Sequence, residues 1–100
     1  MAGKPVEFHP EAADEVEASA KWYRKQSPKA AVGFIQELEH AIDVIAEAPE
    51  RWPAFSHGAR KYLLQRFPFL LVYRELRTTI QVLAVAHGRR RPGYWRNRCG

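Results

Sequence analysis

The sequence predicts an α+β fold with the element order β-α-α-β-β-β. Two adjacent stretches between residues 11 and 48 repeat apolar residues at helical spacing, and three strand-like runs with short links follow between residues 60 and 87. Helices separated only by Gln26 and Ser27 should form an antiparallel hairpin. Consecutive strands with short links should form an antiparallel meander. A chain of 100 residues is expected to form one domain, residues 1–100.

The first half of the chain should supply a short strand and both helices. Residues 5–8 alternate as a strand does, and Pro10 suits the first turn of the helix predicted over residues 11–25. Ser27 and Pro28 are typical of the start of a second helix, which should end near residue 48. The predicted inner face of the first helix consists of Ala13, Val16, Ala20 and Tyr23, with Trp22 covering its edge.

The second half should supply the meander, with strands over residues 60–67, 69–75 and 78–87. Residues 80–86 are an almost unbroken apolar run, too short to span a bilayer, and typical of a buried central strand. His87 and Gly88 end this run. Five arginines and two aromatic residues follow within residues 89–98, so the last strand should deliver them to one edge of the fold.

The charge is divided unevenly along the chain. Residues 1–50 hold five Lys/Arg and ten Asp/Glu, whereas residues 51–100 hold eleven Lys/Arg and one acid, Glu75, for a formal net charge of +5 over the whole chain. Arginine presents a planar fork that binds phosphate or carboxylate in two places. The second half is therefore expected to meet an acidic partner, either nucleic acid or an acidic protein segment, although a solvated basic surface is the simpler interpretation.

Within residues 89–98, alternation along an extended segment would place Arg89 and Arg91 on one side and Arg90 on the other. At least one arginine should then turn inward over the sheet. Trp95 is expected to close the sheet as a hydrophobic lid. Tyr94 is either part of that lid or a platform for stacking bases.

Few residues point to catalysis. His87 is either a general acid or base near neutral pH or, more simply, a residue that hydrogen-bonds a neighbouring carbonyl and shapes the turn. The acids Glu11, Asp14 and Glu15 fit the start of a helix better than the role of general base. The four histidines and the single cysteine, Cys99, show no metal-ligand spacing, so we predict neither a metal nor a cofactor. With no apolar run typical of a signal peptide or membrane helix, we expect a cytoplasmic protein without a membrane partner.

Four segments match a known pattern: residues 6–23 (VEFHPEAADEVEASAKWY), 34–53 (FIQELEHAIDVIAEAPERWP), 66–74 (RFPFLLVYR) and 82–98 (VLAVAHGRRRPGYWRNR). With them the chain resembles the RelE/ParE superfamily of toxins from bacterial type II toxin–antitoxin systems. The ParE-like branch, often described as plasmid stabilisation proteins, is the most similar. The resemblance implies a helical hairpin packed on a twisted antiparallel sheet. It also implies a growth-arresting toxin that forms a hetero-oligomer with a cognate antitoxin.

Such an antitoxin typically wraps an acidic, partly disordered segment over the toxin. We expect it here over the sheet edge formed by the last strand and the following tail. The residues predicted to bind the target or the antitoxin are Arg66, Arg74, Arg89, Arg90, Arg91, Tyr94, Trp95, Arg96 and Arg98.

The superfamily divides by target, because RelE-like members cut messenger RNA on the ribosome and ParE-like members inhibit DNA gyrase. Lys61, Arg90 and approximately Tyr94 match the RelE-type catalytic pattern, but Leu63 and Leu70 stand where that pattern has a lysine and an arginine. Cations stabilise the pentacoordinate phosphate of RNA cleavage, so these two losses argue against an RNase. We therefore predict a gyrase-binding toxin that is not an enzyme. The alternatives are a ribosome-dependent RNase using Lys61, Arg90, Tyr94 and His87, and a degenerate, non-toxic binding module.

Overall fold

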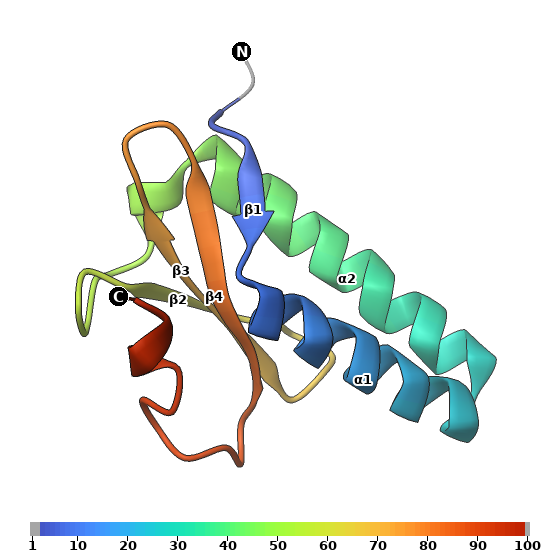
Figure 1. The fold of residues 1–100 in the computed structure, drawn as a ribbon. Helices are drawn as coiled ribbons and strands as arrows, with labels where there is room; N and C mark the ends of the chain where they lie inside the picture. The colour runs from blue at the N-terminus through green and yellow to red at the C-terminus, as the bar shows by residue number, and fades with distance from the viewer. Residues whose placement is uncertain (1–2, 100) are drawn as a thin grey trace.

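The computed structural model describes residues 3–99 (Figure 1). Its elements follow the order β1 (Val6–Phe8), α1 (Pro10–Gln26), α2 (Pro28–Glu47), β2 (Arg60–Leu63), β3 (Phe69–Glu75) and β4 (Ile80–His87). Two 3₁₀ helices, η1 (Pro49–Arg51) and η2 (Arg96–Arg98), lie outside this pattern. The predicted order β-α-α-β-β-β and the α+β class are confirmed.

The four strands of the described region form one sheet in the order β1-β4-β3-β2. β4 lies between β1 and β3, as expected for a central strand. β2, β3 and β4 form the predicted antiparallel meander, but β1 pairs in parallel with β4, with Val6 opposite Ile80 and Phe8 opposite Val82, so the sheet is mixed. Because β1 and β4 run in the same direction, α1 begins beside the second half of β4.

Both faces of the sheet are covered. The helical hairpin covers one face, where a core cluster joins Phe34, Leu38 and Ile45 of α2 to Leu71, Tyr73 and Val82 of the sheet. The segment after β4 turns back over the other face (Figure 1), where Trp95 packs in a second cluster with Ala59, Val72, Leu83 and Ala84. A strand that is covered on both faces is apolar at consecutive positions, which explains the unbroken apolar run of β4.

Two predictions of local structure are wrong. Ala13 is exposed, and the inner face of α1 is instead formed by buried Ala12 and Ala20 with partly buried Val16 and Tyr23. β2 ends at Leu63 rather than at residue 67, because the Glu37 carboxylate of α2 accepts hydrogen bonds from the backbone N–H groups of Gln65 and Arg66. These bonds hold the link to β3 as a loop. Within residues 3–99, no helix combines the length and apolar character needed to cross a membrane.

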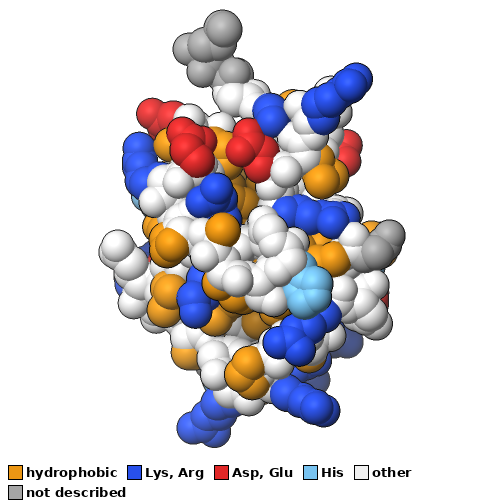
Figure 2. All heavy atoms as spheres, turned by 90° about the vertical axis from the view of Figure 1, so that its left-hand side faces the viewer, with side chains coloured by type: hydrophobic (Ala, Val, Ile, Leu, Met, Phe, Trp, Pro, Cys, Tyr) orange, Lys and Arg blue, Asp and Glu red, His pale blue; other side chains and the backbone are white. Residues whose placement is uncertain are grey.

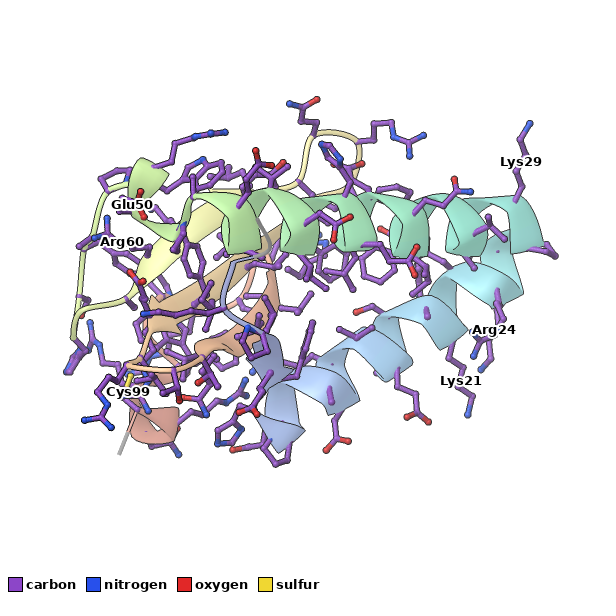
Figure 3. All side chains as sticks on the ribbon, turned by 90° about the horizontal axis from the view of Figure 1, so that it is seen from above. Lys21, Arg24, Lys29, Glu50, Arg60 and Cys99 are labelled. Atoms are coloured by element: carbon purple, nitrogen blue, oxygen red, sulfur yellow. The ribbon has the colours of Figure 1, made fainter. Side chains whose placement is uncertain are left out.

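Charged side chains are distributed unevenly over the surface. Figure 2 shows the face that carries the tail and the loop before β2. Asp and Glu gather near the top of this face, whereas Lys and Arg lie at its top and also over its middle and lower parts. A second basic group lies elsewhere. Figure 3 shows Lys21, Arg24 and Lys29 at the turn of the helical hairpin, at the opposite end of the molecule from Cys99.

Candidate binding site

The C-terminal tail, residues 88–99, begins with a turn held by backbone hydrogen bonds. Gly88 N–H donates to the Pro68 carbonyl at 2.8 Å, and Arg90 N–H donates to the His87 carbonyl at 2.9 Å. The His87 ring packs edge-on against Phe69, and its Nδ1 accepts from Arg89 N–H at 3.1 Å. His87 thus shapes the turn, although by accepting from a backbone N–H rather than by the predicted bond to a carbonyl.

The middle of the tail is fixed by Trp95, which is 3% exposed. Its ring meets Phe55 edge to face, at 5.6 Å between centroids. The chain reverses direction at Gly93, whose φ of +78° is a value that residues with a side chain disfavour. A Cβ at this position would also lie 2.7 Å from the Arg96 guanidinium. Trp95 therefore occupies the lid position predicted for it.

The end of the tail is tied to α1 through the Glu15 carboxylate. Arg98 donates to both carboxylate oxygens at 3.1 Å, the Tyr94 hydroxyl donates at 2.6 Å, and Val85 N–H of β4 donates at 2.9 Å. The side chains of Arg98 and Glu15 are only 7% and 15% exposed. Arg98 also donates to the Leu83 carbonyl at 2.9 Å. We call this group, Glu15 with Tyr94, Val85 and Arg98, the tail clamp.

The tail clamp sets the protonation of its members. Burial raises the pKa of the Glu15 carboxyl, but the hydrogen bonds from Arg98, Tyr94 and Val85 outweigh burial and leave that pKa below 4.5. Burial and the bond to Glu15 raise the pKa of Tyr94 well above its ordinary value. The Tyr94 hydroxyl therefore keeps its proton at neutral pH and is engaged with Glu15.

Arg90 stands over this clamp. Its guanidinium carbon lies 3.9 Å from the centroid of the Tyr94 ring, a cation–π contact that orients the fork. Residues 88–90 form a turn rather than an extended segment, and Arg89, Arg90 and Arg91 are all exposed. The expected inward turn of one arginine is limited to the contact of Arg90 with the Tyr94 ring.

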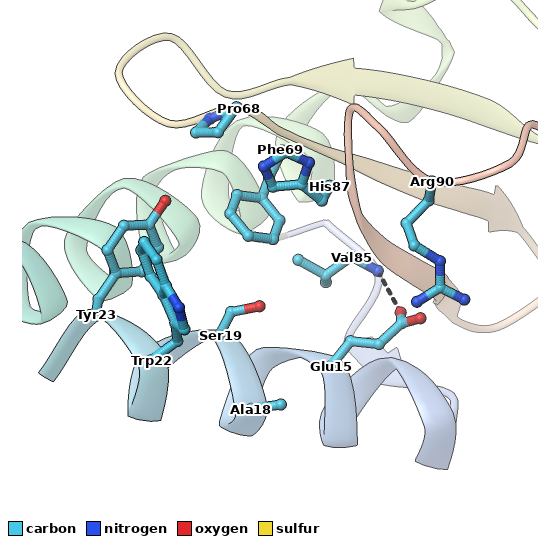
Figure 4. Close-up of a pocket in the computed structure, with 10 residues that line it drawn as sticks. All are labelled: Glu15, Ala18, Ser19, Trp22, Tyr23, Pro68, Phe69, Val85, His87 and Arg90. Carbon is cyan, nitrogen blue, oxygen red and sulfur yellow. Dashed lines mark hydrogen bonds between the residues drawn. The ribbon is translucent and has the colours of Figure 1, made fainter. Parts of the chain in front are cut away.

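Arg90 borders two hollows. The small hollow, of about 180 Å³, lies on the tail side of the sheet, and its basic and aromatic lining includes Lys61, His87, Arg90, Arg91, Tyr94 and Trp95. The helix groove, of about 530 Å³, lies between α1 and the ends of β3 and β4 (Figure 4). Its lining is mostly apolar, with Trp22, Tyr23, Phe69 and Val85, and Arg90 stands at one end beside Glu15. Trp22, predicted to cover a packed edge, is 57% exposed.

The other predicted binding residues are dispersed. Arg74 donates to Gln81 at 3.0 Å and to the Cys99 carbonyl at 2.8 Å, so it holds the end of the tail. Arg66 lies on the loop after β2, where it pairs with Glu37 at 3.2 Å and is not part of the tail surface. Arg96 is exposed and lies against Gly93, and Arg98 is buried in the tail clamp. Of the candidates, the structure brings together Lys61, His87, Arg90, Arg91, Tyr94 and Trp95.

The expectation that the last strand forms a sheet edge holds for only part of it. β3 pairs along the whole of β4, whereas β1 pairs with residues 80–82 alone, so among the described strands none pairs with residues 83–87 on the α1 side. Sequence reasoning also missed Glu15, which was assigned to the start of a helix. A signal was available, since Glu15 has helical spacing to Ala12 and Ser19 and so falls on the inner face of α1. Within residues 3–99 there is no group of three or more His, Cys, Asp or Glu side chains that could hold a metal ion.

The fold and the tail surface define a class, a small α+β protein that presents arginine beside an apolar groove. Comparison with known families is more specific, because the family described as "ParE toxin of type II toxin-antitoxin system, parDE" matches residues 6–92. The chain belongs to this ParE toxin family, within the RelE/ParE superfamily predicted from the sequence.

A solved structure supports the fold. A chain of the "Chromosomal ParDE TA system from P. aeruginosa" superposes with a TM-score of 0.74 at 20% sequence identity, over 84% of this chain and 95% of that chain. No match was found among the curated proteins.

Proposed function

We propose that this toxin arrests growth by binding DNA gyrase, with no catalytic step of its own. The observation that carries the proposal is the state of Tyr94, the residue closest to the catalytic tyrosine position of RNA-cleaving relatives. Its hydroxyl donates to Glu15 at 2.6 Å and its pKa is raised, so it is poorly suited to exchange a proton with RNA. Leu63 and Leu70 stand where the RelE-type catalytic pattern has a lysine and an arginine, so these two positions supply no cation. What remains is a basic, partly aromatic surface suited to binding.

A supercoiling assay with purified gyrase and purified toxin tests this proposal. Micromolar toxin should inhibit supercoiling, and Arg90→Ala should weaken the inhibition because it removes the exposed guanidinium between the two hollows. Arg77→Ala is the matched control, since Arg77 is exposed on the turn between β3 and β4, at the opposite end of these strands from Arg90. Undiminished supercoiling at micromolar toxin would contradict gyrase as the target.

We also propose that the toxin forms a hetero-complex with an antitoxin whose acidic segment binds along the tail. Arg89, Arg90 and Arg91 are exposed and adjacent, and the helix groove beside Arg90 offers apolar surface at Trp22 and Phe69. A segment with apolar side chains and a carboxylate at the Arg90 end fits both features. The neighbouring gene should encode a short protein with an acidic tail. Co-expression of that protein should restore growth.

A ribosome-dependent RNase is the second candidate, because Lys61, His87, Arg90 and Tyr94 do line one hollow. Primer extension on translated messages would show cuts in phase with codons if the protein cleaves RNA. Such cuts should disappear in Arg90→Ala. Messages that stay uncut, together with inhibited gyrase, would exclude the RNase and favour binding of gyrase.

A further inference from the structure

Two acids of α1 pair with the tail: Glu11 lies 3.7 Å from Arg98, and Glu15 binds both Arg98 and Tyr94. The acceptor capacity of Glu15 is used up. Oε1 accepts from Val85 N–H and from Arg98, and Oε2 accepts from the Tyr94 hydroxyl and from Arg98. A carboxylate has about four lone-pair sites, so four donors saturate it. Glu15 therefore borders the helix groove without an acceptor left for a ligand.

The contacts lead from Glu15 to the surface in two steps. Glu15 holds the Tyr94 hydroxyl, which fixes the plane of that ring. The ring in turn supports the Arg90 guanidinium at 3.9 Å from its centroid. Among the ion pairs of residues 3–99, Arg90 takes part in none, so its charge remains available to an anion.

Near Arg90 the backbone of the tail is also held by the hydrogen bonds of its turn, from Gly88 N–H to the Pro68 carbonyl and from Arg90 N–H to the His87 carbonyl, but these bonds do not hold the Arg90 side chain. Arg89, Arg90 and Arg91 are exposed, and Trp95 is the next buried residue of the chain. Glu15 supplies contacts on both sides of Trp95, at Tyr94 and at Arg98, so its loss would free the tail at two points. Charge-assisted hydrogen bonds of this kind are stronger than neutral ones.

We propose that Glu15 is a positioning residue, which clamps the tail to α1 so that Arg90 stands between the small hollow and the helix groove, ready for an anionic group of a partner. The inference rests on the proposed function in one respect, that Arg90 contacts the partner. The clamp itself is a property of the isolated protein.

The clamp is tested on purified protein with Glu15→Gln, and with Glu17→Gln as the control because Glu17 is exposed on the same helix. Trypsin should cut after Arg89, Arg90 and Arg96 roughly tenfold faster in Glu15→Gln, the change in a local opening equilibrium that loss of one charge-assisted hydrogen bond produces. Mass spectrometry locates the cuts. Equal rates at these sites in the variant, the control and the wild type would overturn the clamp.

Tyrosine titration gives a second readout, which a general loss of stability would not imitate. The pKa of Tyr94 should fall in Glu15→Gln, because the carboxylate that holds its proton is gone. The ultraviolet titration curve of Tyr94→Phe identifies which of the four tyrosines has moved. An unchanged Tyr94 titration would contradict the contact between Glu15 and Tyr94.

Induced expression in cells then tests positioning. Growth arrest should weaken in Glu15→Gln as it does in Arg90→Ala. The double variant should lose no more growth arrest than the more affected single variant, since both substitutions act through the Arg90 guanidinium. Tyr94→Phe removes only a hydroxyl and should show the same direction of change if Glu15→Gln folds poorly. Full arrest by Glu15→Gln with a loosened tail, beside lost arrest in Arg90→Ala, would overturn positioning.

Full arrest by Arg90→Ala would instead overturn the proposed contact of Arg90 with the partner. The digestion and the titration decide the clamp separately, so the two failures are distinguishable.

Discussion

At the residue scale, Glu15 makes the stability of this protein depend on pH in a defined direction. Its pKa in the folded state lies below the ordinary value of 4.5, because hydrogen bonds from Arg98, Tyr94 and Val85 outweigh burial. A group whose folded-state pKa is lowered contributes stability that is fully present above its unfolded pKa. That contribution is lost as the pH falls through the folded-state pKa.

Glu15→Gln should therefore reduce the free energy of unfolding by about 1.5–3 kcal/mol at neutral pH, the range for a hydrogen bond to a charged group. The difference from the wild type should shrink as the pH falls below about 4.5, where the native carboxyl also begins to lose its charge. Urea unfolding between about pH 3 and pH 7 measures it. A difference that stays constant over this range would rule out the ionised carboxylate as its source, and exposed Glu17→Gln should follow the wild type throughout.

A second residue-scale prediction concerns Tyr73, which is fully buried in β3. Its hydroxyl donates to the carbonyl of buried Pro49 in η1 at 2.7 Å, and burial raises its pKa to about 12. Tyr73→Phe leaves that carbonyl without its partner, so the free energy of unfolding should fall by about 1–3 kcal/mol. Tyr62→Phe is the control, because Tyr62 is only partly buried in β2. Equal losses of unfolding free energy in both variants would contradict a stabilising hydrogen bond from the Tyr73 hydroxyl.

At the element scale, the tail acts as a packed layer of the fold. Trp95 is 3% exposed over the sheet, whereas Trp22 of α1 is 57% exposed. Trp95→Ala should lower the free energy of unfolding by about 3–5 kcal/mol because it opens a cavity under the tail. Trp22→Ala should change it by no more than about 0.5 kcal/mol. Chemical unfolding of both variants provides the measurement, and similar values for the two would mean that the tail does not close the second face.

The elements also show what the sequence can predict. Hydrophobic patterning is a local signal, and it predicted α2 and β3 nearly to the residue and β4 as the central strand. The aromatic side chain of Trp95 predicted its position as a lid. The end of β2 depends on Glu37, an acid of α2 that is distant in sequence. The parallel pairing of β1 with β4 also depends on distant segments. Neither the end of β2 nor the parallel pairing can therefore be predicted from the residues that are close by in the sequence.

The candidate site divides in the same way. The arginine-rich tail was evident from composition, and the structure gathers Arg90, Arg91 and Tyr94 around one hollow with Lys61. Composition could not separate these residues from Arg98, which is buried, or from Arg66, which pairs with α2. Glu15 was assigned to the dipole of its helix, because the donors that saturate it lie on β4 and the tail.

At the scale of the whole molecule, the surface carries two separate basic groups. Arg89, Arg90 and Arg91 lie on the tail, at one end of the helix groove. Lys21, Arg24 and Lys29 lie at the turn of the helical hairpin (Figure 3). A partner attracted only by net charge would respond equally to the loss of either group. A partner bound at the tail would respond to the first alone, since exposed charges more than about 10 Å apart are largely screened at 0.1 M salt.

Replacing the three arginines of the tail by glutamine, and in a second variant Lys21, Arg24 and Lys29 by glutamine, changes the formal net charge equally. The tail variant should bind the antitoxin at least tenfold more weakly, because even three exposed charge-assisted contacts of about 0.5 kcal/mol each sum to about one decade in affinity. The hairpin variant should bind as the wild type does. Titration calorimetry at two salt concentrations measures both, and the salt dependence should flatten only in the tail variant. Equal losses would show that attraction is governed by net charge, and that the tail arginines hold no privileged position in recognition.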